Sequence, residues 1–461
     1  MKTALRENPA TLAILAVLVL AGLGLRIGYA VEQPAPPPPD AEAYARIAES
    51  LYRDGSFDAR PDGAAREVQP SSAYSPGLPL LVAGLYRVSG GHHLTLALVV
   101  LAILAAGTIP MTFLLGRRFG GPAGGLAAAG LLAFYPALLE YQGLLLTEPL
   151  AAFLLSASLV LFFAAADRAP GSGALWLWLG FGAVFGLLAL VRPEYLPLAI
   201  GLPLVWLCRE AITPADGPKT SDMERFSARR LKGAVMAVAV SLLATVVVVA
   251  PWTIRNAVEL DRFVPISTGG GKALFIGTNL DAGGDAVELR EDLLAERPGL
   301  RSRLSAEGPV DDPDRLVLER VLERVAAESY PDLETDAALG RLGRENLEEG
   351  FTEEPLPFAG MMASKSYEAW TDAPRGVMLD QPWRTIQLGI VVLALAGILV
   401  LIARRRRFDA LLAAIVLLYM TGIAALLIAS PRRELVVLPL LTALAGACAV
   451  EAVRLARGAR G

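Results

Sequence analysis

The chain has 461 residues, of which 54% are hydrophobic, and a formal net charge of -4 at pH 7. The apolar residues are gathered into runs of roughly 20 residues, the length that a helix needs to cross a bilayer. The charge gives no basis for binding nucleic acid. The two cysteines, Cys208 and Cys448, lie in apolar runs, which excludes a disulfide framework in the polar loops.

The first apolar run follows a basic start. Lys2 and Arg6 precede the apolar stretch from Ala10 to Leu25, and Arg26 follows it. A cleaved signal peptide is one alternative for such a pattern. Because Arg26 falls where a small-residue cleavage site would lie, and because more apolar runs follow, we expect an uncleaved first membrane helix.

The hydropathy pattern predicts an α-helical polytopic membrane protein with about ten transmembrane helices. The expected spans are residues 9–29, 93–116, 122–139, 148–166, 173–191, 194–208, 233–252, 385–403, 409–429 and 434–453. The span 194–208 is short and contains Pro197 and Pro203, which neighbouring helices or waters must accommodate.

The basic residues predict the orientation, because cytoplasmic loops are enriched in Lys and Arg. With both termini in the cytoplasm, the inner loops receive most of the basic residues near span ends: Arg117, Arg118, Arg168, the group from Arg209 to Lys232, Arg404 to Arg407, Arg454, Arg457 and Arg460. Arg192, Arg432 and Arg433 are exceptions at predicted outer ends. They are either snorkelling anchors or functional cations.

Two long polar regions then face the outside, which gives three predicted domains. Residues 1–252 form an N-terminal transmembrane module with a catalytic first outer loop at 30–92. Residues 253–384 form an extracytoplasmic loop or small helical cap domain, and residues 385–461 form the C-terminal transmembrane helices. Between residues 281 and 354, apolar residues at helical spacing predict two or three amphipathic helices.

The first outer loop opens with a proline-rich run, 34–39, which favours a stiff extended segment. An amphipathic helix is predicted from Asp40 to Tyr52, because apolar residues recur at i, i+3, i+4, i+7 and i+8 from Tyr44. A second short apolar helix is expected over residues 76–86.

Motifs for nucleotide or zinc binding are absent. The run Gly269 to Lys272 resembles a phosphate loop, but Ala273 stands where Ser or Thr is required. What remains is acids and arginines at predicted outer helix ends. Arginine offers fixed donors to phosphate oxygens, and a carboxylate can accept a proton from a hydroxyl group. This combination suits a reaction on a phosphate-headed lipid.

The order of these residues is similar to that of a known family. The motifs are Asp40-x-x-x-Tyr44, Ser75 to Pro79, Thr147 to Pro149, Arg192 with Pro193, and Pro251 to Asn256. Together they resemble the bacterial GT-C glycosyltransferases, the polyprenyl-phosphate-sugar-dependent group related to protein O-mannosyltransferases and to lipid A aminoarabinose transferases. The resemblance covers residues 10–285 and extends more loosely to 450.

The resemblance implies an inverting transfer of a sugar from a polyprenyl-phosphate donor to an acceptor hydroxyl on a lipid, glycan or protein, at the outer face of the cytoplasmic membrane. It implies that Asp40 is the catalytic base, with Glu42 as the nearest second acid. The candidate residues for binding substrate or lipid phosphate are Glu148, Arg192, Arg255, Asn256, Tyr44 and Arg432.

No cofactor is firmly implied, and a divalent metal ion stays open as a weaker alternative. In several relatives the catalytic Asp is followed directly by Glu, whereas here Ala41 follows and Glu42 comes one residue later. The acid that some relatives carry before the second helix is replaced by the stretch 73–75. Both departures argue against a bound metal, and we assign no metal ligand.

Structural interpretations of the same residues stay open. Asp40 could cap a helix, Glu42 could complement the helix dipole, and Arg255 and Arg432 could be interfacial anchors. A transporter and a non-catalytic membrane scaffold are the alternative functions. A transporter would show inverted repeats and ionisable groups at mid-span. The sequence shows no repeat, and most of its acids lie at span ends, with Asp409 and Glu451 as weak exceptions. The enzyme hypothesis requires that Asp40, Glu148 and Arg255 converge.

Overall fold

The computed structural model describes residues 8–58, 72–168, 172–212, 221–297, 299, 313–372, 382–428 and 431–458. Every regular element in these ranges is helical. The elements are α1 (Pro9–Glu32), α2 (Pro39–Arg53), α3 (Gly77–Ser89), α4 (Leu94–Ala106), α5 (Thr108–Ala133), α6 (Pro136–Glu140), η1 (Tyr141–Gly143), α7 (Glu148–Ala166), α8 (Ser172–Val191), η2 (Pro193–Tyr195), α9 (Leu196–Ile212), α10 (Ser221–Glu259), α11 (Gly270–Thr278), α12 (Ala286–Glu296), α14 (Pro313–Ser329), α15 (Thr335–Thr352), α16 (Pro355–Thr371), α17 (Trp383–Ala403), α18 (Arg407–Leu426), η4 (Pro431–Arg433) and α19 (Glu434–Gly458). The topological signals Lys2, Arg6 and Arg460 lie outside the described residues.

The chain divides into two compact units. The first comprises Met1–Ile266, Arg375–Val416 and Leu435–Gly461, and the second comprises Ser267–Pro374 and Leu417–Glu434. Helix α18 therefore contributes its first turns to one unit and its last turns to the other.

Within the described part of the chain, nine helices are long and apolar enough to cross a membrane. They are Pro9–Glu32, Leu94–Ala133, Glu148–Ala166, Gly173–Val191, Pro193–Ile212, Arg229–Glu259, Trp383–Ala403, Arg407–Leu426 and Glu434–Gly458. The protein is an integral multi-pass membrane protein, as the hydropathy pattern predicted.

The hydropathy pattern predicted about ten spans, and the nine candidate spans of the structure differ from that prediction at one place. The second and third predicted spans both fall mainly in the 40-residue stretch Leu94–Ala133. Gly121 interrupts it with φ 76° and ψ -174°, a conformation that glycine tolerates. A side chain added at Gly125 would lie 2.7 Å from the carbonyl oxygen of Phe113. The two halves of α5 are therefore packed against each other, and the chain reverses direction at Gly121.

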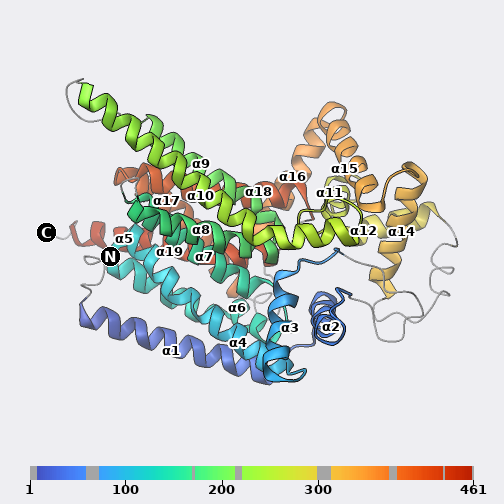
Figure 1. Ribbon diagram of the computed structural model, residues 1–461, viewed down its shortest axis with the longest axis horizontal. Coiled ribbons are helices and arrows are strands. Elements are labelled where there is room, and N and C mark those ends of the chain that lie inside the picture. The colour runs from blue at the N-terminus through green and yellow to red at the C-terminus, as the bar shows by residue number, and fades with distance from the viewer. Residues whose placement is uncertain are drawn as a thin grey trace. The chain divides into compact units, whose positions relative to one another are not determined.

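In the first unit, α1 lies alongside α4 and α5 (Figure 1). Arg26 of α1 is buried and donates hydrogen bonds to the carbonyl oxygens of Gly22, Leu132 and Ala133. The last two carbonyls end α5, where a helix leaves its final C=O groups without intrahelical partners. Arg26, the one buried cation of α1, thus supplies hydrogen-bond donors to the last carbonyl groups of a neighbouring helix.

Helix α7 connects two polar ends of the first unit. Its first residue, Glu148, pairs with Arg192, which follows α8. Beyond its other end Asp167 pairs with Arg118, and Arg118 also pairs with Asp409 of α18. The 19 residues of α7 rise about 28 Å, close to the thickness of a bilayer core. Residues predicted for the outer face meet at one end of α7, and residues predicted for the inner face meet at the other.

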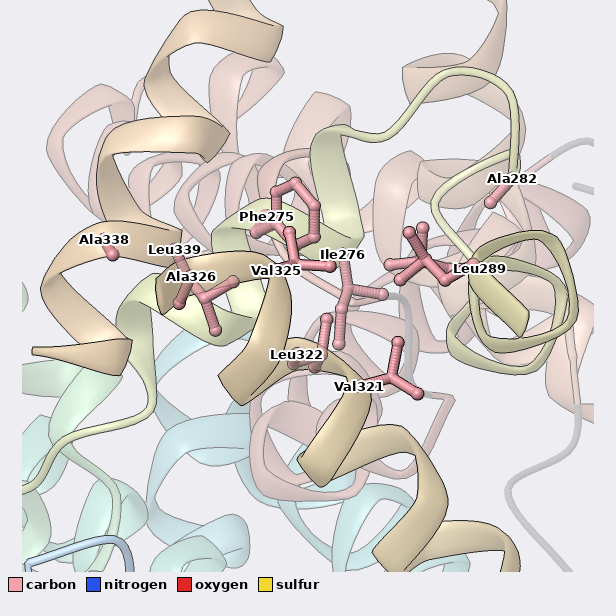
Figure 2. Packing of buried hydrophobic residues seen from close by; sticks show 11 residues of the cluster. Phe275, Ile276, Ala282, Leu289, Val321, Leu322, Val325, Ala326, Ala338 and Leu339 are labelled. Carbon is pink, nitrogen blue, oxygen red and sulfur yellow. The ribbon is translucent and has the colours of Figure 1, made fainter. Parts of the chain in front are cut away.

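In the second unit, α11, α12, α14 and α15 pack around one apolar cluster (Figure 2). Its buried members are Phe275, Ile276, Ala282, Leu289, Leu293, Val321, Leu322, Val325, Ala326, Ala338 and Leu339. This cluster accounts for the amphipathic spacing that the sequence shows between residues 281 and 354. The same unit contains α16 and the last turns of α18.

Candidate active site

Helix α2 places Asp40 and Tyr44 one turn apart on the same side. The helix begins with Pro39, whose fixed φ suits the first helical position, and the N-cap residue is Pro38, which has no side-chain capping bond. Asp40 is therefore the second residue of the helix, so the structural alternative that it serves as the N-cap does not hold. In the first turn its charge still complements the helix dipole. Its side chain is half-buried.

A buried ion network lies where α7 begins and α8 ends. Oε1 of Glu148 lies 3.2 Å from Nη1 of Arg192, and Oε1 of Glu194 lies 2.8 Å from Nε of the same guanidinium. Arg192 also donates a 3.5 Å hydrogen bond to Oγ1 of Thr147. Burial lowers the pKa of Arg192, but the negative charges of Glu194 and Glu148 outweigh this effect, so the pKa of Arg192 is raised overall. The guanidinium thus stays charged and fixes both carboxylates.

Tyr44 joins Asp40 to this network. Burial raises the pKa of the Tyr44 hydroxyl, and the negative charges of Asp40 and Glu148 raise it further, while Arg192 acts in the opposite direction. The phenol therefore stays protonated at neutral pH and can donate a hydrogen bond. Its ring packs edge-on against Tyr74, with 5.4 Å between the ring centroids.

An apolar cluster connects α2 with α8 and α10. Ile47 of α2 is buried together with Leu190 of α8 and Trp252 of α10. Phe57 packs edge-on against Trp252 at 4.8 Å. Three segments that carry predicted site residues are therefore fixed to one another through a shared core.

Arg255 follows Trp252 by one turn of α10. Its guanidinium carbon lies 4.9 Å from the Trp252 ring centroid and 5.8 Å from that of Phe57. Its Nη1 donates a 3.1 Å hydrogen bond to Oδ1 of Asn256. These contacts connect Arg255 to the apolar cluster that contains Ile47 of α2. The convergence of Asp40, Glu148 and Arg255 that the enzyme hypothesis requires stays a prediction.

Asn256 is fully buried and braces the segment that follows α10. Its Nδ2 donates to the carbonyl oxygens of Val264 at 3.1 Å and Ile266 at 3.0 Å. The indole nitrogen of Trp252 donates to the Ile266 carbonyl at 2.7 Å. Asn256 therefore positions Arg255 and this segment, and the geometry favours that role over direct contact with a phosphate.

The two remaining predicted residues are Glu42 and Arg432. Glu42 is partly exposed and faces Arg46 at 3.5 Å, an i, i+4 pair on the surface of α2, so we assign it no catalytic role. Arg432 lies in η4 of the second compact unit, where the neighbouring Arg433 donates to the carbonyl oxygen of Ile428 at 2.7 Å.

Two contributors are absent from the predicted site residues. Tyr74 lies in the stretch 73–75, which was noted for a missing acid and not for an aromatic ring. Glu194 follows Arg192 by two residues, and that short spacing was the available signal for a local ion pair.

The cluster has a distinct electrostatic character. Glu148 and Glu194 both pair with Arg192, and Asp40 acts electrostatically on the neighbouring Tyr44, so acids outnumber cations among these residues. Such a region stabilises positive charge on a reactant better than it binds a phosphate. Among the described residues, no group of three or more His, Cys, Asp or Glu side chains could hold a metal ion, and we route no step through one.

No protein-family model and no curated protein matches the sequence. Solved structures do match. The apo crystal structure of the Archaeoglobus fulgidus oligosaccharyltransferase is 14% identical, with a TM-score of 0.52, and the match covers 98% of this chain and 52% of that chain. The archaeal oligosaccharyltransferase AglB of the same organism, in complex with an inhibitory peptide and a dolichol-phosphate, is 15% identical, with a TM-score of 0.54 and coverages of 98% and 51%.

ArnT from Cupriavidus metallidurans in the apo state matches more weakly, with 16% identity, a TM-score of 0.38 and coverages of 96% and 78%. The oligosaccharyltransferase matches define the class of fold. The chain has a fold similar to the transmembrane region of GT-C glycosyltransferases, which confirms the resemblance seen in the sequence. The chain spans about half the length of the oligosaccharyltransferases that it matches.

Proposed function

We propose that this protein is a membrane glycosyltransferase of the GT-C type. It would move a sugar from a polyprenyl-phosphate donor to an acceptor hydroxyl at the outer face of the cytoplasmic membrane. One observation carries the proposal: Asp40, Tyr44, Glu148 and Arg192 gather at one end of a bundle with a GT-C-like fold. The dolichol-phosphate bound to AglB supports a donor of this chemical class.

In the proposed step, the acceptor oxygen attacks the anomeric carbon of the sugar, and the bond between that carbon and the phosphate oxygen breaks. The hydroxyl proton goes to the carboxylate of Asp40, and general-base catalysis of this kind contributes about 100- to 10,000-fold. The lipid phosphate leaves with the bonding electrons. Attack from the opposite face inverts the anomeric configuration.

The other residues of the site have supporting roles in this proposal. Glycosyl transfer develops positive charge at the anomeric centre, which the net negative charge around Glu148 would stabilise. Tyr44 would donate a hydrogen bond to the sugar. Arg192 acts as a positioning residue, because two carboxylates already engage its guanidinium. The leaving phosphate would bind at Arg255, a cation from another helix.

The test is label transfer in membranes that contain the wild type or the Asp40→Asn variant. Labelled polyprenyl-phosphate hexoses serve as donors, and lipid, glycan and protein fractions are each scanned for label. Asn keeps the size of Asp but cannot act as a base, so transfer should fall about 100-fold or more. Asp54→Asn, an exposed acid at the other end of α2, is the matched control. Equal transfer by both variants would remove Asp40 as the base, and absence of transfer from every donor would reject the proposed reaction.

A further inference from the structure

Helix α16 in the second unit carries an exposed apolar face. Leu356 is 84% exposed and Tyr367 is 63% exposed, and the small residues Ala359, Gly360 and Ala363 are exposed between them. At spacings of three, four, seven and eleven residues these positions share one side of a helix. A contiguous apolar face of this kind marks an interaction surface.

The opposite side of α16 is firmly held. Phe358, Met361, Lys365 and Ala369 are buried. The ammonium group of Lys365 donates hydrogen bonds to the carbonyl oxygen of Gly277 in α11 and, at 2.8 Å, to that of Ala425 in α18. Because these bonds fix the rotation of α16 about its axis, the apolar face has a defined direction.

The C-terminal end of α16 lies beside a candidate membrane span. Nε1 of Trp370 donates a 3.0 Å hydrogen bond to Oγ1 of Thr421, which lies inside the span Arg407–Leu426. Five residues separate Thr421 from the end of α18 at Leu426, a rise of about 7.5 Å along the helix axis. The end of α16 is therefore level with apolar turns of α18 and not beyond them.

We propose that α16 lies in the membrane interface and that its exposed apolar face binds the lipids of the leaflet at the C-terminal end of α18. The lipid-facing surface of α18 supports this occupant, because Leu418, one turn before Thr421, is 69% exposed. Tyr367 and Trp370 are the aromatic residues that concentrate at membrane interfaces.

The chemistry of the face also specifies the kind of lipid contact. The only charged residues of α16 are Lys365, which is buried, and Glu368, which accepts a 2.9 Å hydrogen bond from Ser364. The exposed face therefore offers no cation to anionic headgroups. Binding should therefore depend on apolar contact, and it should occur on bilayers of zwitterionic phosphatidylcholine that contain no anionic lipid.

The experiment places an environment-sensitive fluorophore on single cysteines in phosphatidylcholine nanodiscs, which leave both leaflets accessible. The background carries Cys208→Ser and Cys448→Ser, and the labelled variants are Leu356→Cys and Tyr367→Cys. Arg341→Cys, at an exposed position of α15, is the water-facing control. Each variant is tested with a lipid carrying a spin-label quencher in its acyl chain and, separately, with iodide.

The inference predicts that the lipid quencher removes most of the emission at positions 356 and 367 and little at 341, with the reverse order for iodide. If iodide quenches all three positions alike and the lipid quencher none, the face lies in water and the proposal is wrong. A monodisperse elution profile for each variant shows that the fold is kept. The readout involves no sugar transfer, so it is independent of the proposed enzymatic function.

Discussion

Oε1 of Glu148 lies 3.2 Å from Nη1 of Arg192, and the two side chains are only 3% and 11% exposed. Glu194 reaches the same guanidinium at 2.8 Å. One buried cation thus compensates acids from two segments, the start of α7 and η2. Because removal of one partner from a buried pair leaves an uncompensated charge, we expect this network to be a site of high sensitivity to substitution.

Arg192→Met should lower the stability of the protein by about 3–5 kcal/mol, since a buried pair is broken. Glu148→Gln should cost less, because Glu194 continues to neutralise Arg192. The measurement is the apparent unfolding temperature in detergent micelles. Arg53→Met removes an exposed i, i+4 pair with Glu49 and should change little. Equal unfolding temperatures for the Arg192 and Glu148 variants would contradict the shared-cation arrangement.

The sequence predicted the helices well, because apolar periodicity and run length depend on each segment alone. The helix from Asp40 to Tyr52 appears as α2, and the apolar segment 76–86 appears as α3. The reversal at Gly121 falls between the predicted spans 93–116 and 122–139, where Arg117 and Arg118 interrupt the apolar run.

The site could be predicted only in part. Among the acids and arginines predicted at outer helix ends, Glu148 and Arg192 do lie 3.2 Å apart. Their pairing could not be read from the chain, since Arg192 bonds both its near neighbour Glu194 and the distant Glu148. The inward orientation of Asn256, which braces two backbone carbonyls, likewise depends on how the segment after α10 folds back.

Tyr44→Phe tests the proposed hydrogen bond to the sugar. The ring packing against Tyr74 does not need the hydroxyl, so the fold should be kept, whereas transfer should fall by about 100-fold if the phenol stabilises the transition state. The measurement is kcat for label transfer. Tyr52→Phe, on the same helix and packed edge-on against Tyr86, is the matched control. A loss shared by both variants would point to disturbance of α2 and not to a bond with substrate.

Lys365 makes the stability of the second unit depend on pH. Burial lowers the pKa of Lys365 to about 8, nearby Arg433 contributes in the same direction, and Glu368 opposes it. In the unfolded chain a lysine titrates near pH 10.4. Between these two pH values the unfolded chain binds a proton that the folded protein lacks, so stability rises with pH in this window.

The measurement is the unfolding temperature of the wild type and of Lys365→Met from about pH 7.5 to about pH 9.5. Methionine does not titrate, and the loss of the bonds to Gly277 and Ala425 is the same at every pH. The difference between the two proteins should therefore shift in favour of the wild type as the pH rises. A difference that stays constant across the range would show that Lys365 does not titrate there.

Arg255→Gln separates a phosphate ligand from an interfacial anchor. A hydrogen bond from a guanidinium to a phosphate is charge-assisted and contributes about 1.5–3 kcal/mol, so its loss should weaken binding of farnesyl phosphate by about 10- to 100-fold. Farnesol has the same chain without the phosphate, and its affinity should not change. Both dissociation constants are measured calorimetrically in detergent. Arg53→Gln, on the exposed surface of α2, controls for the loss of a positive charge. If the Arg255 variant loses affinity for farnesol and farnesyl phosphate alike, Arg255 supports the aromatic cluster of Trp252 and Phe57, and the leaving phosphate must bind elsewhere.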